Sequence, residues 1–304
     1  MSERVRYRIC HDTAYEYASD VLHAHHLLHL IPRPTPYQQC LEHTISVKPA
    51  TFRRRDEIDA FGNAFTRIEF GHPHRRLEIV TQMEVDVHPR PTVFAAGSMP
   101  WEWLCAELAY HGAGPTRENL EACRFRHESP YVRVKQEFTD YAADCFPAGR
   151  PILACADALM MKLHREVKYA PGATTVATPL REVLKNRRGV CQDFAHLMIA
   201  CLRSRGLAAR YVSGYLRAAP ARSAAPAASP AIGAGASHAW VAVYTPPFGW
   251  LEFDPTNNVW VGTGHVAVAW GRDFGDVSPV HGVILGGSTH KLSVSVTVTP
   301  ITQS

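Results

Sequence analysis

Long apolar runs are missing from this sequence. No stretch of its 304 residues approaches the roughly eighteen consecutive apolar residues that a membrane-spanning helix requires. Residues 1–9 also lack the apolar segment of a secretory signal, because arginine recurs at every second position from Arg4 to Arg8. We therefore expect a cytoplasmic protein that has no membrane partner.

Paired cysteines and clustered positive charge are missing as well. The eight cysteines include no Cys-x-x-Cys pair, and the chain is far larger than a disulfide-stapled scaffold, so we expect reduced thiols. The formal net charge is only +4, and no basic stripe interleaved with aromatic residues is present, which argues against a nucleic-acid partner. We interpret the arginine triplet at 53–55 as a solvated strand edge or turn.

The composition is that of an ordinary globular protein, with 46% hydrophobic and 20% charged residues, which is enough to bury a sizeable core. Residues 1–90 alternate in the manner of β-strands, and glycine, asparagine and proline punctuate the alternation. We predict that this N-terminal domain is an antiparallel β-sandwich. Its expected strands are 4–10, 13–17, 39–47, 65–70 and 77–87.

Residues 91–130 are broken by proline and glycine, and we interpret them as a segment that leads into a second domain at 131–304. This domain begins with helical apolar spacing, and Thr178 and Pro179 have the character of a helix cap and a first helical residue. A helical lobe followed by an antiparallel sheet is an α+β fold of the papain-like kind. The expected elements are helices at 132–146, 152–167 and 179–184, and strands at 209–216, 237–244, 250–256 and 291–300.

One segment places a cysteine at the start of a buried helix. Gly189 breaks the preceding loop, and after Cys191 apolar residues recur with the spacing of one helix face until Gly206. The free N–H groups and the dipole at a helix N-terminus stabilise negative charge and favour the reactive thiolate. Asp193 is placed to cap the first turn. Cys191 is therefore a candidate nucleophile, although an isolated cysteine would be interpreted as a core residue.

A thiolate nucleophile needs a base and a group that orients the base, and two downstream strands supply them. His238 starts one strand, Asp254 ends the next, and five residues, 245–249, connect the two strands. That connection sets Trp240 opposite Asp254 and leaves His238 as the diagonal neighbour at roughly 7 Å, within reach of an imidazole and a carboxylate. A four-residue connection would place His238 and Asp254 on opposite faces.

Three motifs carry a resemblance to a known family. They are Gly189-Val190-Cys191-Gln192-Asp193-Phe194-Ala195, Ser237-His238-Ala239-Trp240 and Phe253-Asp254-Pro255-Thr256-Asn257. Together with 59–63 and 271–273, they resemble the bacterial transglutaminase-like superfamily, in the branch that has a β-rich N-terminal region before a transglutaminase-like catalytic core. The resemblance implies a catalytic triad in which Cys191 is the nucleophile, His238 the base and acid, and Asp254 the orienting carboxylate.

Four further residues are candidates for substrate binding. Gln192 follows the nucleophile and has an amide to point at the site. Tyr169 approaches the same loop, where its hydroxyl would join the backbone N–H of the nucleophile in stabilising an oxyanion. Trp240 lies on the strand that carries the base. Asp273 belongs to a stretch that resembles a cleft-lining position of the family.

Other histidines receive structural interpretations. The four between 23 and 29 alternate between strand faces, with no cysteine or carboxylate at ligand spacing, so we interpret them as polar strand residues and not as a metal site. His196 points about 140° away from the nucleophile around the helix. His265 lies in the C-terminal strand region, and we interpret it as structural. A thiol and an imidazole suffice for the chemistry, so no metal or organic cofactor is expected.

The expected reaction is acyl transfer from a peptide or amide substrate through a thioester, and we favour hydrolysis by a cysteine peptidase or amidase. A transglutaminase that transfers the acyl group to an amine is one alternative, and a catalytically silent binding or scaffold module is another. The stretch 218–236, rich in alanine, serine, proline and glycine, is expected to be a surface loop, either a lid or a neutral insertion. The acyl acceptor and the oligomeric state stay open.

Overall fold

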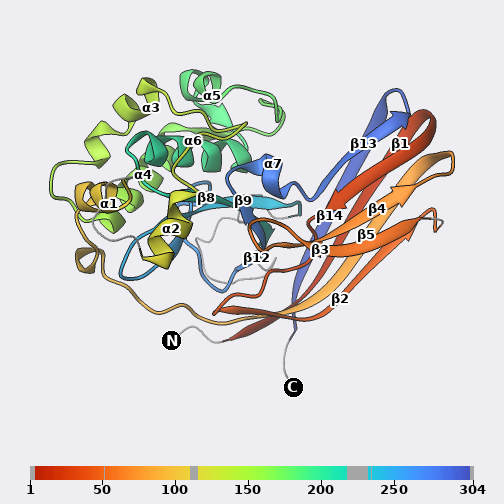
Figure 1. Ribbon diagram of the computed structural model, residues 1–304, viewed down its shortest axis with the longest axis horizontal. Coiled ribbons are helices and arrows are strands. Elements are labelled where there is room, and N and C mark those ends of the chain that lie inside the picture. The colour runs from red at the N-terminus through yellow and green to blue at the C-terminus, as the bar shows by residue number, and fades with distance from the viewer. Residues whose placement is uncertain (1–3, 51, 110–115, 218–231, 234, 302–304) are drawn as a thin grey trace, which may run out of the picture.

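The structure is a computed structural model, and it describes residues 4–50, 52–109, 116–217, 232–233 and 235–301. A body of helices packs on one sheet, and a second, longer sheet extends away from this body (Figure 1). The chain therefore has the predicted α+β fold. None of the helices within these ranges is long and apolar enough to cross a membrane. Most of the expected loop at 218–236 lies outside the described residues.

The N-terminal β region is antiparallel, as predicted, and its strands join into one seven-stranded sheet in the order β2-β5-β1-β4-β3, with β13 and β14 also paired to β1. A buried apolar cluster that includes Val21, Leu28, Ile68 and Leu77 fills this region. The arginines at 53–55 lie exposed on the edge strand β3, in agreement with their interpretation as a solvated edge. The strands are β1 (Val5–Leu28), β2 (Gln38–Lys48), β3 (Arg53–Ile58), β4 (Ala64–Phe70), β5 (His74–Val87), β13 (Val280–Gly286) and β14 (His290–Ile301).

Strand β1 organises this sheet along its full length. The expected strands 4–10 and 13–17 are parts of this single 24-residue strand, which has an irregularity between Glu16 and Val21. Its first half pairs with β5 and β14, and its second half pairs with β4 and β13 (Figure 1). The C-terminal strand expected at 291–300 therefore forms, but it joins the N-terminal sheet. Alternation specifies a half-buried face, and it does not specify the partner strand.

The helices surround the segment that carries Cys191. The expected helix at 152–167 is confirmed as α4, whereas the one at 132–146 is reduced to α3 and a 3₁₀ turn, Ala143–Cys145. Thr178 does not cap α5 because its hydroxyl accepts from the Thr175 N–H, and Pro179 occupies the cap position. The helices are α1 (Trp101–Glu107), α2 (Arg117–Cys123), α3 (Gln136–Tyr141), α4 (Ile152–Glu166), α5 (Leu180–Asn186), α6 (Cys191–Ser204) and α7 (Phe274–Val277).

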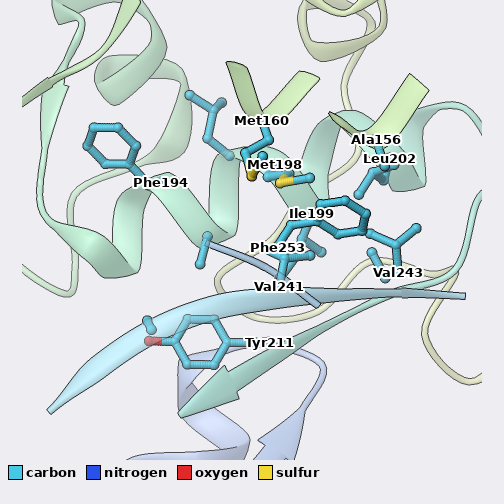
Figure 2. Close-up of a cluster of buried hydrophobic side chains, with 14 of the residues drawn as sticks. Ala156, Met160, Phe194, Met198, Ile199, Leu202, Tyr211, Val241, Val243 and Phe253 are labelled. Atoms are coloured by element: carbon cyan, nitrogen blue, oxygen red, sulfur yellow. The ribbon is translucent and has the colours of Figure 1, made fainter. Parts of the chain in front are cut away.

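Helix α6 is almost wholly buried between α4 and the five-stranded sheet on which the helices pack. Its residues Met198 and Ile199 lie near Phe253 of β10 and Val241 of β9 in one buried cluster, and Phe194 of the same helix lies apart from these two strand residues (Figure 2). Apolar burial of this kind contributes about 25 cal/mol per Å², so the helix is held firmly against the sheet. The sheet has the order β11-β10-β9-β8-β12, and β6 and β7 form a separate parallel pair. The strands are β6 (Lys168–Tyr169), β7 (Arg188–Gly189), β8 (Ala209–Leu216), β9 (His238–Tyr244), β10 (Trp250–Asp254), β11 (Val259–Trp260) and β12 (His265–Gly271).

Two side-chain amides from the N-terminal region dock on the free edge of β12. The Gln38 amide accepts from the Ala267 N–H at 2.8 Å and donates to the Ala267 carbonyl at 2.7 Å. The Asn63 amide does the same at Trp270, at 3.0 Å and 2.8 Å. Each amide thus imitates a neighbouring strand and satisfies backbone groups that would otherwise be an open sheet edge.

We predict that Gln38→Ala lowers the free energy of unfolding by about 1–3 kcal/mol, because it leaves the Ala267 N–H without its acceptor and the Ala267 carbonyl with only the Arg33 N–H at 3.3 Å. Urea unfolding followed by circular dichroism measures the change. Gln39→Ala is the matched control, since Gln39 is exposed on the same strand. Equal midpoints for the two variants would contradict a docking role for Gln38.

Buried histidines make the fold sensitive to acid. Burial lowers the pKa of His11 from its ordinary 6.5 to about 4, and it does the same for His26, with neighbouring histidines adding to the effect. His11 lies at the contact between the two sheets, where its ring nitrogens hydrogen-bond to Tyr215 at 2.8 Å and Thr13 at 3.0 Å. Between about pH 6.5 and 4, these two histidines therefore bind protons in the unfolded chain and stay neutral in the folded chain.

We expect the free energy of unfolding to fall as the pH is lowered from about 6.5 to about 4, because His11 and His26 take up protons in that window in the unfolded chain but not in the folded chain. Denaturant midpoints measured across this range should decline less steeply in His11→Gln than in the native chain. His25→Gln, at an exposed site on the same strand, should keep the native slope. If His11→Gln kept the slope of the native chain, His11 would not contribute to the loss of stability in acid.

Candidate active site

Helix α6 presents Cys191 in its first turn. Asp193 Oδ2 accepts hydrogen bonds from the Val190 N–H at 2.8 Å and from Thr174 Oγ1 at 2.6 Å. Burial raises the pKa of Asp193, and these two hydrogen bonds oppose the rise. Gly189 leaves room for the carboxylate, because a Cβ there would lie 2.7 Å from Asp193 Oδ2. The predicted cap by Asp193 is confirmed, and it fixes the loop before the free, partly buried Cys191 thiol.

Strands β9 and β10 bring a histidine and an aspartate together. The five residues 245–249 connect the strands, which pair with Val241 opposite Phe253. Asp254 is then the diagonal neighbour of His238, which is the register that the length of the connection predicts. His238 Nε2 lies 2.8 Å from Asp254 Oδ2, and both side chains are fully buried.

The Asp254 carboxylate receives five hydrogen bonds. Oδ1 accepts from the backbone N–H groups of Thr256 at 3.0 Å and Asn257 at 3.2 Å. Oδ2 accepts from His238 Nε2, from Asn257 Nδ2 at 2.8 Å and from His265 Nε2 at 3.2 Å. Burial alone would raise the pKa of Asp254, but the hydrogen bonds from the two histidines outweigh burial and hold this pKa far below its ordinary value. The carboxylate is therefore an anion at any pH of interest.

The hydrogen bond to Asp254 decides which nitrogen of His238 does chemistry. Because Nε2 donates to the carboxylate, Nδ1 carries the lone pair of the neutral ring. Burial opposes a charged imidazole, but the bond to Asp254 and the neighbouring Cys191 raise the pKa of His238 well above its ordinary value. The arrangement can accept a proton from a thiol and hold it as imidazolium.

The end of the stretch 218–236 that the structure describes lies against this imidazole. Gly233 has a φ of +96°, and a Cβ on it would lie 2.4 Å from His238 Nδ1, so glycine alone fits here. Asn257 anchors the segment, because its amide accepts from the Ile232 N–H at 2.8 Å and donates to the Ile232 carbonyl at 3.1 Å. Asn257 thus holds both the segment over the imidazole and the carboxylate beneath it.

Two of the four candidate substrate-binding residues have backbones close to Cys191 and partly exposed side chains. Gln192 is partly buried next to Cys191 on α6. Tyr169 is also partly buried, and it pairs with Gly189, two residues before Cys191; burial and, to a lesser extent, the charge of Cys191 raise the pKa of Tyr169. Tyr169 lines a cavity of about 320 Å³ together with Phe194, Ile232 and neighbouring residues. The cavity therefore lies between Tyr169 and the segment at Ile232 that Asn257 anchors.

The other two candidates are corrected by the structure. Trp240 is fully buried under the site, and its indole N–H donates to Glu252 at 2.6 Å. Asp273 is also fully buried, where it caps α7 through the Gly275 N–H and accepts from the Tyr131 N–H, both at 2.9 Å. Neither side chain has a free surface for a substrate. Position along the chain placed both near the site, but it could not reveal the direction of their side chains.

Sequence reasoning missed two residues of the site. Asn257 was part of a motif without an assigned role, and His265 was interpreted as structural. Both donate to Asp254 Oδ2. His265 belongs to β12, which is separated from β10 in the sheet by β9 and β8, so no local spacing connects it to Asp254. Among the residues that the structure describes, no three His, Cys, Asp or Glu side chains form a group that could hold a metal ion.

Comparisons with known proteins agree with this architecture. Residues 7–86 match the bacterial transglutaminase-like N-terminal region, and residues 140–255 match the transglutaminase-like superfamily. An uncharacterized protein of Mycobacterium tuberculosis is 37% identical over 303 residues, which cover 97% of this chain and 93% of the relative. An uncharacterized protein of Mycobacterium leprae is 32% identical over 295 residues, which cover 97% and 98%.

A solved structure shows the same fold. The crystal structure of a candidate cysteine protease from Cytophaga hutchinsonii aligns with a TM-score of 0.75 at 20% identity, covering all of this chain and 93% of that one. This chain belongs to the bacterial transglutaminase-like superfamily, as the sequence motifs predicted. At the level of the family, membership supports a thiol-dependent enzyme.

We predict that Asp254→Asn lowers the pKa of His238 by at least about one unit, because the imidazolium loses the adjacent negative charge. Nitrogen-detected NMR of the histidine rings across a pH titration measures this pKa. Asp140→Asn, at an exposed site on α3, is the control and should leave the titration unchanged. An unaltered His238 pKa in Asp254→Asn would show that the pair is not coupled in solution.

Proposed function

We propose that this protein is a thiol-dependent acyl-transfer enzyme that hydrolyses an amide or peptide bond through Cys191, His238 and Asp254. The observation that carries the proposal is the buried Asp254–His238 pair beside the helix N-terminus that presents Cys191. A carboxylate that orients an imidazole next to a thiol is the arrangement of nucleophilic acyl transfer. The superfamily membership of the chain supports the same chemistry at a coarser level.

The proposed reaction has two halves. His238 Nδ1 takes the proton of the Cys191 thiol, and the sulfur attacks the carbonyl carbon of the amide. The tetrahedral intermediate collapses to a thioester as His238 returns the proton to the leaving amine. Water then attacks the thioester while His238 accepts a proton from it, and collapse releases the acid and the thiol. Asp254 keeps its hydrogen bond to Nε2 throughout and does not itself take the proton.

The oxyanion of each intermediate would form at the start of α6. The first N–H groups of a helix have no acceptor within the helix, so the backbone N–H of Cys191 is our first oxyanion donor. We assign Tyr169 as the second, because it is partly buried and pairs with Gly189, two residues before Cys191. The cavity beside Tyr169 would hold the flanking part of the substrate.

The surroundings of the imidazole favour water over an amine as the acyl acceptor. Gly233 packs against His238 Nδ1, which leaves that nitrogen fully buried. The acceptor must lose its proton to this nitrogen, so it has to enter a narrow space. Water is the smallest acceptor available, whereas the side chain of a lysine would have to displace the segment at Gly233. For this reason we place hydrolysis ahead of amine transfer.

We predict that iodoacetamide alkylates Cys191 at least about tenfold faster at pH 6 in the native chain than in His238→Ala, because the imidazolium stabilises the thiolate. Peptide mass spectrometry after short exposures gives the rate at each cysteine separately. Cys10 and Cys40 are internal references, since both are partly exposed and burial raises the pKa of each. They should react appreciably only at higher pH.

If Cys191 follows the same pH profile as Cys40, or does not react, the catalytic proposal is wrong and a binding module becomes the better description. If the thiolate is present, the acceptor can be tested with a peptide library, with and without an added primary amine. Release of free acid at a rate that the amine does not change would support hydrolysis. Incorporation of the amine into the acyl product would instead establish a transferase.

A further inference from the structure

We infer that His265 is a second positioning residue of the site, which shares the charge of Asp254 and so limits how strongly His238 holds its proton. The observation behind this inference is that two imidazoles converge on one carboxylate oxygen. His238 Nε2 and His265 Nε2 lie 2.8 Å and 3.2 Å from Asp254 Oδ2. The inference rests on the proposed function, because a proton held by His238 matters only if this residue acts as base and acid.

The surroundings of His265 direct its ring at the carboxylate. It is the first residue of β12 and pairs with Leu216 at the end of β8, so its backbone is fixed by the sheet. The Trp240 indole meets the ring edge-on, with centroids 5.3 Å apart and an angle of 76° between the planes. Glu252 in turn holds this indole through its N–H. Within the described part of the chain, Asp254 is the hydrogen-bond partner of His265, and its Nδ1 has none.

Within the described residues, a small set of ionisable groups lies around this pair. Cys191 faces His238 from α6, and Asp254 faces both imidazoles from β10. Behind Trp240 lies Glu252, which forms an ion pair with Arg90 at 3.2 Å. Arg217, next to the end of β8, is directed at Tyr7. Asp254 is therefore the negative charge to which both His238 and His265 hydrogen-bond.

Each hydrogen bond that a carboxylate accepts makes the carboxylate a weaker acceptor for its other donors. Oδ2 already accepts hydrogen bonds from His238 and Asn257, and Oδ1 accepts from two backbone N–H groups. The carboxylate therefore keeps its orientation without His265. What His265 adds is a further N–H that withdraws electron density from Oδ2. The imidazolium of His238 is then stabilised less, and it remains a strong enough acid to protonate a leaving amine.

We expect His265→Leu to strengthen the Asp254–His238 pair. Alkylation of Cys191 by iodoacetate, an anion that the imidazolium attracts, should give a bell-shaped pH profile in the native chain. In His265→Leu this pH profile should broaden on both its acid and its basic side. The alkylation rate at about pH 5 should be about three- to tenfold higher than in the native chain. Acylation by an amide substrate should slow by a similar factor, because His238 becomes a weaker acid.

His265→Gln and His11→Gln are the matched variants. The glutamine amide has an N–H that can reach Oδ2, so His265→Gln should retain the native profile. His11 is a buried, hydrogen-bonded histidine outside the site, and its substitution should lower stability without changing the profile. Circular dichroism at each pH confirms that the variants are folded.

Each outcome decides between the proposals. If Cys191 of the native chain does not react as a thiolate at about pH 5, the proposed function itself is overturned. A native thiolate with a His265→Leu profile that is unchanged or narrower overturns only the charge-sharing role, and a narrower one indicates a purely structural support. NMR of the native chain tests the inference without any variant: His265 must carry its proton on Nε2, and a proton on Nδ1 alone would exclude donation to Asp254.

Discussion

The buried carboxylate of Asp254 is the constraint on which the rest of the site depends. A carboxylate removed from water is costly unless donors surround it. Here the donors come from β9, from β12 and from the turn after β10. Forming these hydrogen bonds to the carboxylate requires one register of β9 on β10 and brings β12 to the same end of the sheet. It also selects the tautomer of His238. One desolvated charge thereby aligns three separate parts of the chain.

The N-terminal region stabilises the same arrangement from outside. Strand β12 is the edge of the five-stranded sheet and carries His265 at its start. Gln38 and Asn63 satisfy its free edge, and the C-terminal strands β13 and β14, which follow the core in the sequence, return to β1. The two sheets are therefore linked by hydrogen bonds and by a chain that crosses between them twice. The β-rich region acts as a frame for the strand that reaches the carboxylate.

Access to the site is limited by the segment that Asn257 anchors. Its amide holds the backbone of Ile232 with one set of bonds and the Asp254 carboxylate with another, so the cover over the imidazole and its orienting anion share one residue. Gly233 permits this contact because it has no side chain. The segment covers Nδ1 of the imidazole, and the cavity lined by Tyr169 lies along the same segment at Ile232.

The sequence by itself determined the elements that depend on local patterns. These are the helix that starts at Cys191, its cap by Asp193, the strands β2, β4, β5, β8, β9, β10 and β14, and the five-residue connection that makes His238 and Asp254 diagonal neighbours. Period and loop length are local properties, so they can be inferred without a structure. Only the tertiary structure decided that His265 reaches Asp254, that Trp240 and Asp273 turn inward, and that the last strands pair with β1. These outcomes depend on which distant strands become neighbours, and alternation along one strand does not encode its partner.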